Sequence, residues 1–292
     1  IEKGSVPTKA DRDGELIIKD MAELAARLLD KNHIPLSEVA YAGIATPGVA
    51  NNDDGLVEYA NNLPFLNFPI AKLFKKYLNV PKVYVENDAN TAALGEAIAG
   101  VGKGVGNFVA VTLGTGVGSG IIVNGKIVNG VTYAGGEMGH TVIMVNGKQC
   151  NCGRKGCWEQ YASATALIAQ TKDAMKKDVN SIMWDLVENN IARVSGRTAF
   201  DAMRKGDATA KQVVDNYIRY IGVGLTNVIN ALQPDVICIG GGISHEKDNL
   251  LIPLRKHTHC NRYSIYATKQ TEICCAVLGN DAGIIGAALL DN

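Results

Sequence analysis

The chain lacks several features that would point to whole classes of protein. It has no excess of either charge, with 29 basic and 29 acidic residues among 292, and no run of lysine or arginine. The composition therefore gives no electrostatic footprint for nucleic acid or for an anionic membrane. No stretch approaches the roughly 20 apolar residues that a membrane-spanning helix needs, and nothing resembles a signal peptide. Small substrates are the favoured partners.

Cysteines are few and odd in number, which argues against a disulfide framework. Of the seven, three lie in one tight pattern, and Cys274 and Cys275 are adjacent. Thiols in a reducing compartment are the simpler interpretation. We therefore expect a cytoplasmic protein.

What the chain does have is enough apolar content for a large core, with 47% hydrophobic residues. At this length a single core usually splits, so two domains are expected. In the first part of the chain, apolar residues recur at helical spacing over residues 20–29 and 70–78. Strands are expected at residues 39–45 and 82–86, and the second of these leads into a helix. This is βαβ organisation.

A glycine-rich stretch at residues 100–106 separates this part from a different pattern. Short strands are expected at residues 108–113 and 119–123. The dipeptide Asn124-Gly125 is a strong signal for a type I′ hairpin turn. A second domain therefore begins here.

Helical patterns then dominate residues 163–232, and the last of these helices is expected to begin at Asp207. A buried strand at residues 236–239 follows. The final helix, residues 281–290, is expected to pack back across the junction between the domains.

We expect an α/β protein whose smaller domain comprises residues 1–104 together with the C-terminal helix 280–292. Residues 105–279 would form the larger domain. The chain opens with Ile1, in what looks like the end of a strand over residues 1–6. We expect that encoded residues, and with them the first strands of the smaller domain, precede this start.

The most informative pattern is a group of three cysteines and one histidine: His140, Cys150, Cys152 and Cys157. Thiolates and an imidazole are preferred zinc ligands, and four of them leave no open position for catalysis, so a structural Zn²⁺ is expected. The ion would hold two carboxylates, Glu137 and Glu159, near each other. Unlinked buried thiols, or a disulfide between two of them, are the alternatives.

Two glycine-rich turns each follow an expected strand. In such turns backbone N–H groups can approach an anion closely, and threonine hydroxyls add donors. Neither turn is a P-loop or a dinucleotide fingerprint, and each can also be read as a tight connection and no more. The candidate nucleotide contacts are Thr112, Gly114, Thr115 and Gly116 in the first turn and Gly240, Gly241 and Gly242 in the second.

Asp88 is the best single candidate for chemistry, because it lies where a strand gives way to a helix. Ligands gather at the carboxyl ends of strands in α/β sheets, so a carboxylate there can reach a bound hydroxyl. Aspartate is also a preferred helix N-cap, and a purely structural role is the alternative.

Five sequence motifs follow one another along the chain. They are Ala-Thr-Pro-Gly at 45–48, Glu-Asn-Asp-Ala-Asn at 86–90, Leu-Gly-Thr-Gly-Val-Gly at 113–118, Gly-Glu-x-Gly-His at 136–140 and the cysteine segment at 150–159. In this order they resemble the ROK family of sugar kinases and repressors, and the kinase arrangement is most similar to the bacterial glucokinases within it. The resemblance covers nearly the whole chain, and the last two motifs are highly specific.

This resemblance implies a two-lobed, actin-like ATPase fold of the ribonuclease H type with a central cleft. A hexose would lie deep in the cleft with ATP and Mg²⁺ above it, and the protein would be a homodimer. Asp88 would be the general base that takes the proton from the 6-hydroxyl of the sugar, with glucose as the leading substrate. The implied sugar contacts are Gly48, Asn87, Asp88, Glu137, His140 and Glu159.

One family motif has no counterpart. The amino-terminal Asp-x-Gly-Gly-Thr loop, which contacts phosphate in the family, would lie before Ile1. We attribute this to truncation, and expect a polypeptide that truly begins at Ile1 to be nearly inactive.

Other functions on the same fold stay open. An N-acetylmannosamine kinase or another hexose kinase would carry the same motifs, because these sugars differ by single groups. A sugar-responsive repressor is a different class, but residues 1–20 have neither the length nor the basic charge of a helix-turn-helix. A sugar-binding protein without catalysis would need a substituted base, and Asp88 is present.

Overall fold

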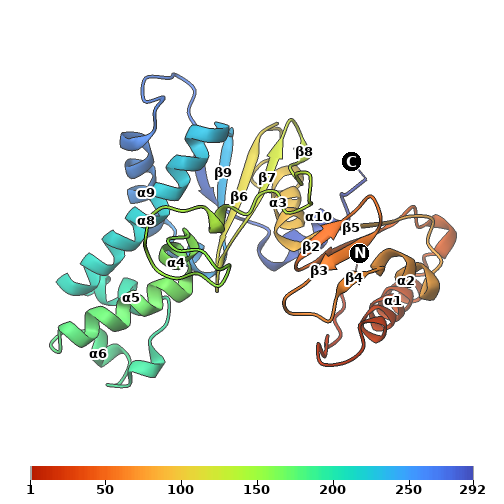
Figure 1. Ribbon diagram of the computed structural model, residues 1–292, viewed down its shortest axis with the longest axis horizontal. Helices are drawn as coiled ribbons and strands as arrows, with labels where there is room; N and C mark the ends of the chain where they lie inside the picture. Colours follow the sequence, from red (N-terminus) through yellow and green to blue (C-terminus); the bar gives the residue numbers. More distant parts are fainter. Residues whose placement is uncertain (1, 292) are drawn as a thin grey trace.

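The computed structural model describes residues 2–291 (Figure 1). The α-helices are α1 (Gly14–Lys31), α2 (Ile70–Tyr77), α3 (Asp88–Ile98), α4 (Glu159–Ala162), α5 (Ala164–Lys177), α6 (Met183–Leu186), α7 (Thr198–Arg204), α8 (Ala208–Leu232), α9 (Asp248–Asn261) and α10 (Ala282–Ala287). The strands are β1 (Ala42–Thr46), β2 (Val49–Asn51), β3 (Leu56–Tyr59), β4 (Leu66–Phe68), β5 (Val83–Asn87), β6 (Phe108–Leu113), β7 (Val117–Val123), β8 (Lys126–Ile127), β9 (Val236–Gly240) and β10 (Glu272–Cys275).

Two small sheets form the part of the molecule that comes first in the chain. Strand β1 pairs in parallel with β5, and its last residue, Thr46, lies opposite Asn87. Strands β2, β3 and β4 form an antiparallel sheet beside it. Helices α1 and α2 pack on each other and supply apolar side chains to one core. Its fully buried members include Ile18, Val57, Ile70 and Val85.

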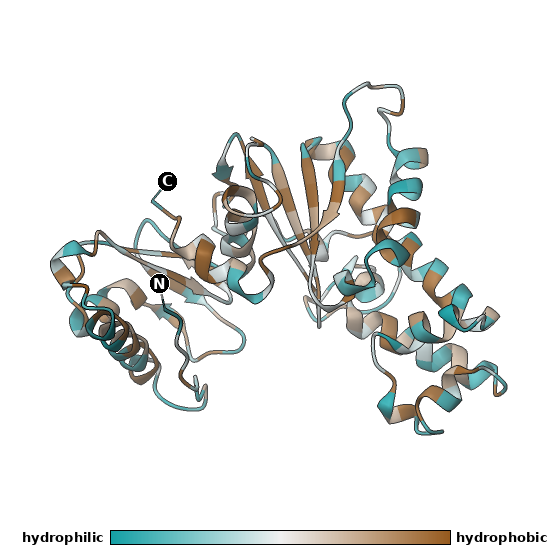
Figure 2. Ribbon diagram, turned by 180° about the vertical axis from the view of Figure 1, so that it is seen from behind, coloured by the Kyte–Doolittle hydropathy of each residue, from teal (hydrophilic) through white to brown (hydrophobic). Residues whose placement is uncertain are grey.

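A five-stranded sheet in the order β10-β9-β6-β7-β8 forms the other part. Every residue of β9 is buried, as expected for a continuous apolar strand covered on both faces. Alternate residues of β6 face two different cores: Val109 and Val111 pack with the residues of α8, whereas Phe108 packs with those of α3. The strands of this sheet are correspondingly hydrophobic in Figure 2.

Helices α3 and α10 lie between the five-stranded sheet and the smaller sheets, as Figure 1 shows. They cross closely because Gly286 has no side chain: a Cβ there would lie 1.6 Å from the carbonyl oxygen of Thr91. At Gly43 of β1, a Cβ would lie 1.8 Å from the carbonyl oxygen of Ala287. Helix α10 therefore packs back on the first part of the chain, as predicted. The division of the chain near residue 104 stays a prediction.

Most predicted elements are present, with shifted ends. Strand β6 has the predicted bounds, and Asn124 and Gly125 have φ angles of +51° and +76°, which fits a type I′ turn. Helix α1 starts six residues before the predicted start at residue 20, because the side chain of Asp13 caps it by accepting the N–H of Glu15. Helix α10 is shorter than predicted: a 3₁₀ turn, Gly279–Asp281, precedes it, and residues 288–290 form a turn instead of continuing the helix.

The predicted strand at the start of the chain is wrong for the part that the structure describes. Residue 1 lies outside the described residues, and residues 2–8 form no strand. This segment instead runs beside α1, where Gly4 packs against Leu24 and Leu28. Residues 2–8 therefore pack against helix α1 and are not part of a sheet.

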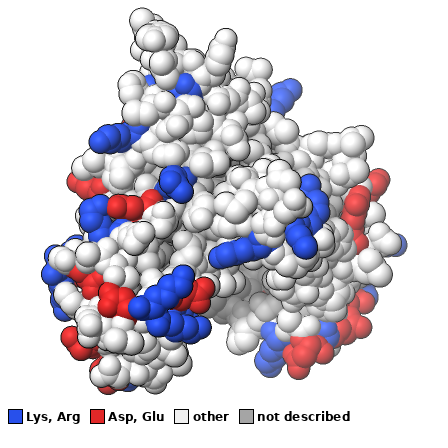
Figure 3. Space-filling model, turned by 60° about the vertical axis from the view of Figure 1, so that its left-hand side comes forward, with Lys and Arg blue, Asp and Glu red and all other residues white. Residues whose placement is uncertain are grey.

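Within residues 2–291, no helix is both long enough and apolar enough to cross a membrane. On the face shown in Figure 3, basic and acidic side chains are interspersed. This matches the equal numbers of the two charges in the sequence.

Candidate active site

Asp88 is the first residue of α3, directly after β5, and it is not the helix cap. The cap is Asn87, whose Oδ1 accepts the N–H groups of Ala89 at 2.8 Å and of Asn90 at 3.3 Å. The capping alternative for Asp88 is therefore wrong, because its neighbour fills that role. Asp88 itself accepts the N–H of Ala89 at 2.8 Å.

The carboxylate of Asp88 is reached by solvent but lies among crowded protein atoms. Burial raises its pKa above the ordinary value, and the backbone N–H groups of Ala89 and Asp88 oppose this only in part. A raised pKa makes a carboxylate a stronger base, so the position suits proton transfer from a bound hydroxyl.

Gly48 lies beside this helix start because Asn87 donates its side-chain N–H to the carbonyl oxygen of Gly48 at 2.9 Å. The φ angle of Gly48 is +91°, and a Cβ there would lie 2.1 Å from the carbonyl oxygen of Tyr59. Both features require glycine. The turn between β1 and β2 is thus fixed against the end of β5.

Glu137 is exposed and precedes a 3₁₀ turn, η2 (Met138–His140). Ser119 of β7 fixes this segment, because its hydroxyl donates to the carbonyl oxygen of Gly136 and accepts the N–H of Met138 at 3.1 Å. Glu137 is therefore presented from a segment that is tied to the five-stranded sheet.

Glu86, to which the sequence analysis gave no role, connects the segment that follows β8 with the start of α3. It is 3% exposed. Its two carboxylate oxygens accept the side-chain N–H groups of Asn90 and of Asn129, each at 3.0 Å. Glu86 immediately precedes Asn87, but nothing in the local pattern shows that Asn129 would be its partner.

Glu159, the first residue of α4, lies against the first glycine-rich turn. Its Oε2 accepts the N–H of Val117 at 3.0 Å, and a Cβ on Gly116 would lie 2.3 Å from the same oxygen. The carboxylate therefore contacts the turn that was predicted to hold phosphate. Its other oxygen, Oε1, takes no part in this contact.

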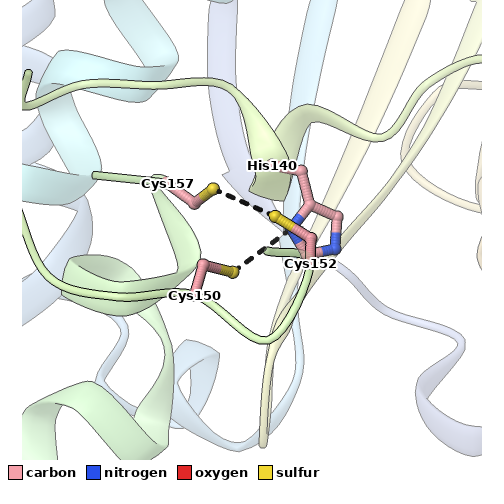
Figure 4. Close-up of side chains that lie close together, drawn as sticks. All are labelled: His140, Cys150, Cys152 and Cys157. Atoms are coloured by element: carbon pink, nitrogen blue, oxygen red, sulfur yellow. Dashed lines mark hydrogen bonds between the residues drawn. The ribbon is translucent and has the colours of Figure 1, made fainter. Parts of the chain in front are cut away.

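The four predicted zinc ligands converge on one point (Figure 4). Their ligand atoms all lie within 4.8 Å of one another. The Sγ of Cys150 is 3.6 Å from Nδ1 of His140, and the Sγ atoms of Cys152 and Cys157 are 3.5 Å apart. Tetrahedral thiolate ligands about 2.3 Å from zinc would be roughly 3.7 Å apart, so the residues fit a zinc ion.

The segment that carries the cysteines is anchored on α8 through Trp158, which is completely buried. The indole N–H of Trp158 donates to the carbonyl oxygen of Tyr220 at 2.9 Å. A Cβ on Gly224 would lie 2.0 Å from the indole ring, so the tryptophan lies directly on the helix backbone. Glu159 follows this anchor in the chain.

The two glycine-rich turns lie side by side, because β6 and β9 are adjacent and Thr112 is opposite Gly240. In the first turn the N–H of Gly114 donates to the carbonyl oxygen of Gly116 at 3.0 Å. The hydroxyl of Thr165 donates to the carbonyl oxygen of Thr115 at 2.8 Å, which ties this turn to α5.

A cavity of about 540 Å³, within the usual range for a small-molecule site, opens beside the second turn. It brings together the ends of β6 and β9, helix α3 and the segment between β10 and α10. The cavity is lined by Ala92, Glu96, Ala110, Thr112, Cys238, Gly240, Gly241, Gly242, Ser244, His245, Ala276, Val277, Gly279, Asn280 and Ala282. Four predicted nucleotide contacts, Thr112 and the three glycines, therefore share one cavity.

The family model of the ROK family matches residues 3–292. The chain belongs to the ROK family. Its predicted fold, the α/β two-lobed, actin-like ATPase fold with a central cleft, is confirmed by the solved ROK kinases that it resembles.

Two ROK relatives are similar over almost the whole chain. The chain is 37% identical to a glucokinase of Halalkalibacterium halodurans, over 99% of this chain and 87% of the relative. It is 35% identical to a glucokinase of Thermotoga maritima, over 98% of this chain and 90% of the relative.

Among solved structures, a ROK family glucokinase from Streptomyces griseus in complex with glucose and AMPPNP matches with a TM-score of 0.79. It is 30% identical, and the match covers 98% of this chain and 89% of the other. ROK relatives also include repressors: a xylose repressor of Caldicellulosiruptor bescii is 29% identical, and the match covers 61% of its length.

Proposed function

We propose that this ROK protein is an ATP-dependent kinase that phosphorylates a hexose, with glucose as the leading substrate, at the 6-hydroxyl. The observation that carries the proposal is the position of Asp88: it stands at the start of α3, while Asn87 takes over the cap. Relatives named glucokinase, at 35% and 37% identity, support the same activity.

Asp88 acts as the general base in this proposal. Its carboxylate accepts the proton of the hexose 6-hydroxyl as that oxygen attacks the γ-phosphorus of ATP, and the bond from phosphorus to the ADP oxygen breaks. A positioned base of this kind accounts for a factor of roughly 10² to 10⁴ in rate. Mg²⁺, when bound to ATP, neutralises charge on the transferred phosphoryl group.

The hexose would be held by residues from four segments around Asp88. Asn87 has one side-chain N–H committed to Gly48, so its second N–H is left for a sugar hydroxyl. Glu137, Glu159 and His140 would supply further polar groups, and the backbone at Gly48 would approach the ring.

The structural Zn²⁺ belongs to the same proposal. His140 turns Nδ1 toward Cys150, and Figure 4 shows its other ring nitrogen on the side away from the sulfur atoms. A metal held by Cys150, Cys152, Cys157 and Nδ1 would fix the ring, so that Nε2 faces the sugar in one tautomer.

ATP would lie across the two glycine-rich turns. The adenosine fits the 540 Å³ cavity beside Gly240, Gly241 and Gly242. Its phosphates would extend along Thr112, Gly114, Thr115 and Gly116, where bare backbone allows close approach. The homodimer that the family resemblance implies and the cytoplasmic location expected from the cysteines are also part of this proposal.

Steady-state kinetics test the proposal. We expect ADP release that depends on a hexose, with the highest kcat/KM for glucose in a panel that also contains N-acetylmannosamine, mannose, allose and fructose. Asp88→Asn should lower kcat by roughly 10² to 10⁴ while both substrates still bind.

The outcomes separate the alternatives. A preference for N-acetylmannosamine would keep the kinase and change its substrate. Hexose binding without ADP release for any sugar would reject the kinase and leave the repressor or sugar-binding classes, whereas full turnover by Asp88→Asn would reject only the base.

A further inference from the structure

Glu96 is a carboxylate near the end of α3 that the proposed chemistry does not use. It is 2% exposed, and it lines the cavity that would hold the adenosine. Burying a carboxylate is costly unless its oxygens are hydrogen-bonded. The partners of Glu96 therefore show which parts of the fold depend on it.

One carboxylate oxygen holds the segment between β10 and α10. Oε1 of Glu96 accepts the backbone N–H of Val277 at 2.9 Å and of Leu278 at 2.7 Å. This segment forms a lip of the cavity, since Val277, Gly279 and Asn280 are among the lining residues. Val277 itself is 65% exposed, so little packing from its own side chain holds the lip in place.

The other oxygen and the backbone of Glu96 hold the turn between α3 and β6. Oε2 accepts the N–H of Val101 at 3.3 Å, and the carbonyl oxygen accepts the N–H of Gly102 at 2.8 Å. A Cβ on Gly100 would lie 2.1 Å from Oε2, so the carboxylate lies directly over that glycine.

We infer that Glu96 is a positioning residue for the nucleotide: it fixes the lip at Val277 and Leu278 and thereby the shape of the adenosine cavity. The inference about Glu96 rests on the proposed function, which identifies the ligand of the cavity as ATP. The carboxylate oxygens of Glu96 already accept N–H groups of the protein. Glu96 therefore acts through the position of the lip rather than by contact with the adenine ring of the nucleotide. Helix α3 then serves both substrates, with Asp88 at its first residue and Glu96 eight residues later.

The test is Glu96→Gln, which keeps the shape of the side chain but replaces one acceptor oxygen with a donor. At least one backbone N–H then loses its partner. We expect the KM for ATP, and the Kd for AMPPNP measured by calorimetry, to rise roughly tenfold or more, while the KM for the hexose stays within about twofold. Gly100→Ala keeps the carboxylate but displaces it, and should weaken AMPPNP binding in the same direction.

Asp207→Asn is the matched control. Asp207 is also buried, at 7% exposed, and its carboxylate accepts the N–H groups of Ile182 and of Ala210, each at 2.6 Å. It lies outside the lining of the cavity. This variant should lose thermal stability and keep wild-type affinity for AMPPNP.

Equal AMPPNP affinity in wild type, Glu96→Gln and Gly100→Ala would overturn the inference. So would a loss of hexose affinity as large as the loss of nucleotide affinity, because that would show a general disturbance of the fold. Calorimetry measures binding without turnover. If the wild-type protein bound AMPPNP but transferred no phosphate, the proposed function would be rejected, while the comparison of AMPPNP affinities would still decide the role of Glu96.

Discussion

At the scale of single residues, the proposed function places two opposed demands on Asp88. Proton transfer needs an ionised carboxylate, whereas the crowded surroundings disfavour the charge and raise the pKa of Asp88. Asn87 caps α3, so the side chain of Asp88 is not needed as the helix cap. A side chain kept for chemistry in this way is expected to reduce the stability of the fold.

The pH dependence of stability tests this account of Asp88. A group whose pKa is raised in the fold stabilises the fold most below its unfolded pKa, and this contribution is lost as the pH rises through the raised value. Asp88→Asn does not titrate. The melting temperature of the variant, relative to wild type, should therefore increase from pH 3 to pH 7 in thermal unfolding followed by circular dichroism.

If the difference in melting temperature between Asp88→Asn and wild type stayed constant over that pH range, it would contradict a raised pKa for Asp88. A variant that becomes relatively less stable toward pH 7 would do so as well, since it would show that the charge of Asp88 stabilises the native state.

Which residues could be predicted from the sequence depended on how far away their partners lie. The zinc ligands lie within 18 residues of chain, from His140 to Cys157, so their spacing alone indicated one site. Glu86 and Glu96 could not be assigned, because each has a partner far away in the chain, at 43 and 181 residues respectively, besides a local one. The choice between Asn87 and Asp88 as cap was also beyond the sequence, since both residue types are good caps.

At the scale of elements, the segment from Gly136 to Glu159 carries half of the candidate sugar contacts but contains little regular structure. It is fixed at Ser119 at one end and at Trp158 at the other. Between these points isolated bridges pair Val142 with Cys157 and Gln149 with Lys155. Backbone hydrogen bonds from the N–H of Ile143 to Gly156, at 2.9 Å, and from that of Trp158 to Thr141, at 2.8 Å, also cross it. Because these links are isolated rather than part of a sheet, we expect the segment to depend on its cysteine and histidine group.

Removal of zinc should therefore weaken hexose binding more than nucleotide binding. We expect one zinc per chain by elemental analysis, and none in Cys150→Ala. The Kd for the hexose in that variant should rise roughly 10- to 100-fold, because the orientation of His140 is lost. The Kd for AMPPNP should change little.

Cys260→Ala is the matched control, because Cys260 is exposed and lies outside the ligand group. It should keep both the zinc and the affinity. Wild-type protein without zinc, or a zinc-free variant with unchanged hexose affinity, would contradict the role given to the metal.

Elements whose limits are set by local signals were predicted well. The start of α8 follows its cap, Asp207, and the hairpin follows Asn124-Gly125. Strand β7 starts at Val117, two residues before the predicted start, because its pairing with β6 extends to Leu113 and tertiary contact rather than sequence sets its length.

At the scale of the whole molecule, α3 and α10 join the parts that would bind the two substrates. Helix α3 packs its apolar face, including Ala93 and Ala97, on the five-stranded sheet. Its first residue, Asp88, follows β5 of the smaller part. The hexose and the adenosine of ATP would thus lie at opposite ends of this helix, with the triphosphate extending toward Asp88. The sequence indicated both sites but not that a single helix connects them.

Identification of the product by NMR tests the central claim most directly. When the protein is incubated with ATP, Mg²⁺ and glucose, phosphate should appear on the 6-oxygen, with one ADP formed for each sugar phosphate. The 6-deoxy analogue of glucose should yield no sugar phosphate. Phosphate on another oxygen, or transfer to the 6-deoxy analogue, would contradict an account in which Asp88 takes the proton of the 6-hydroxyl.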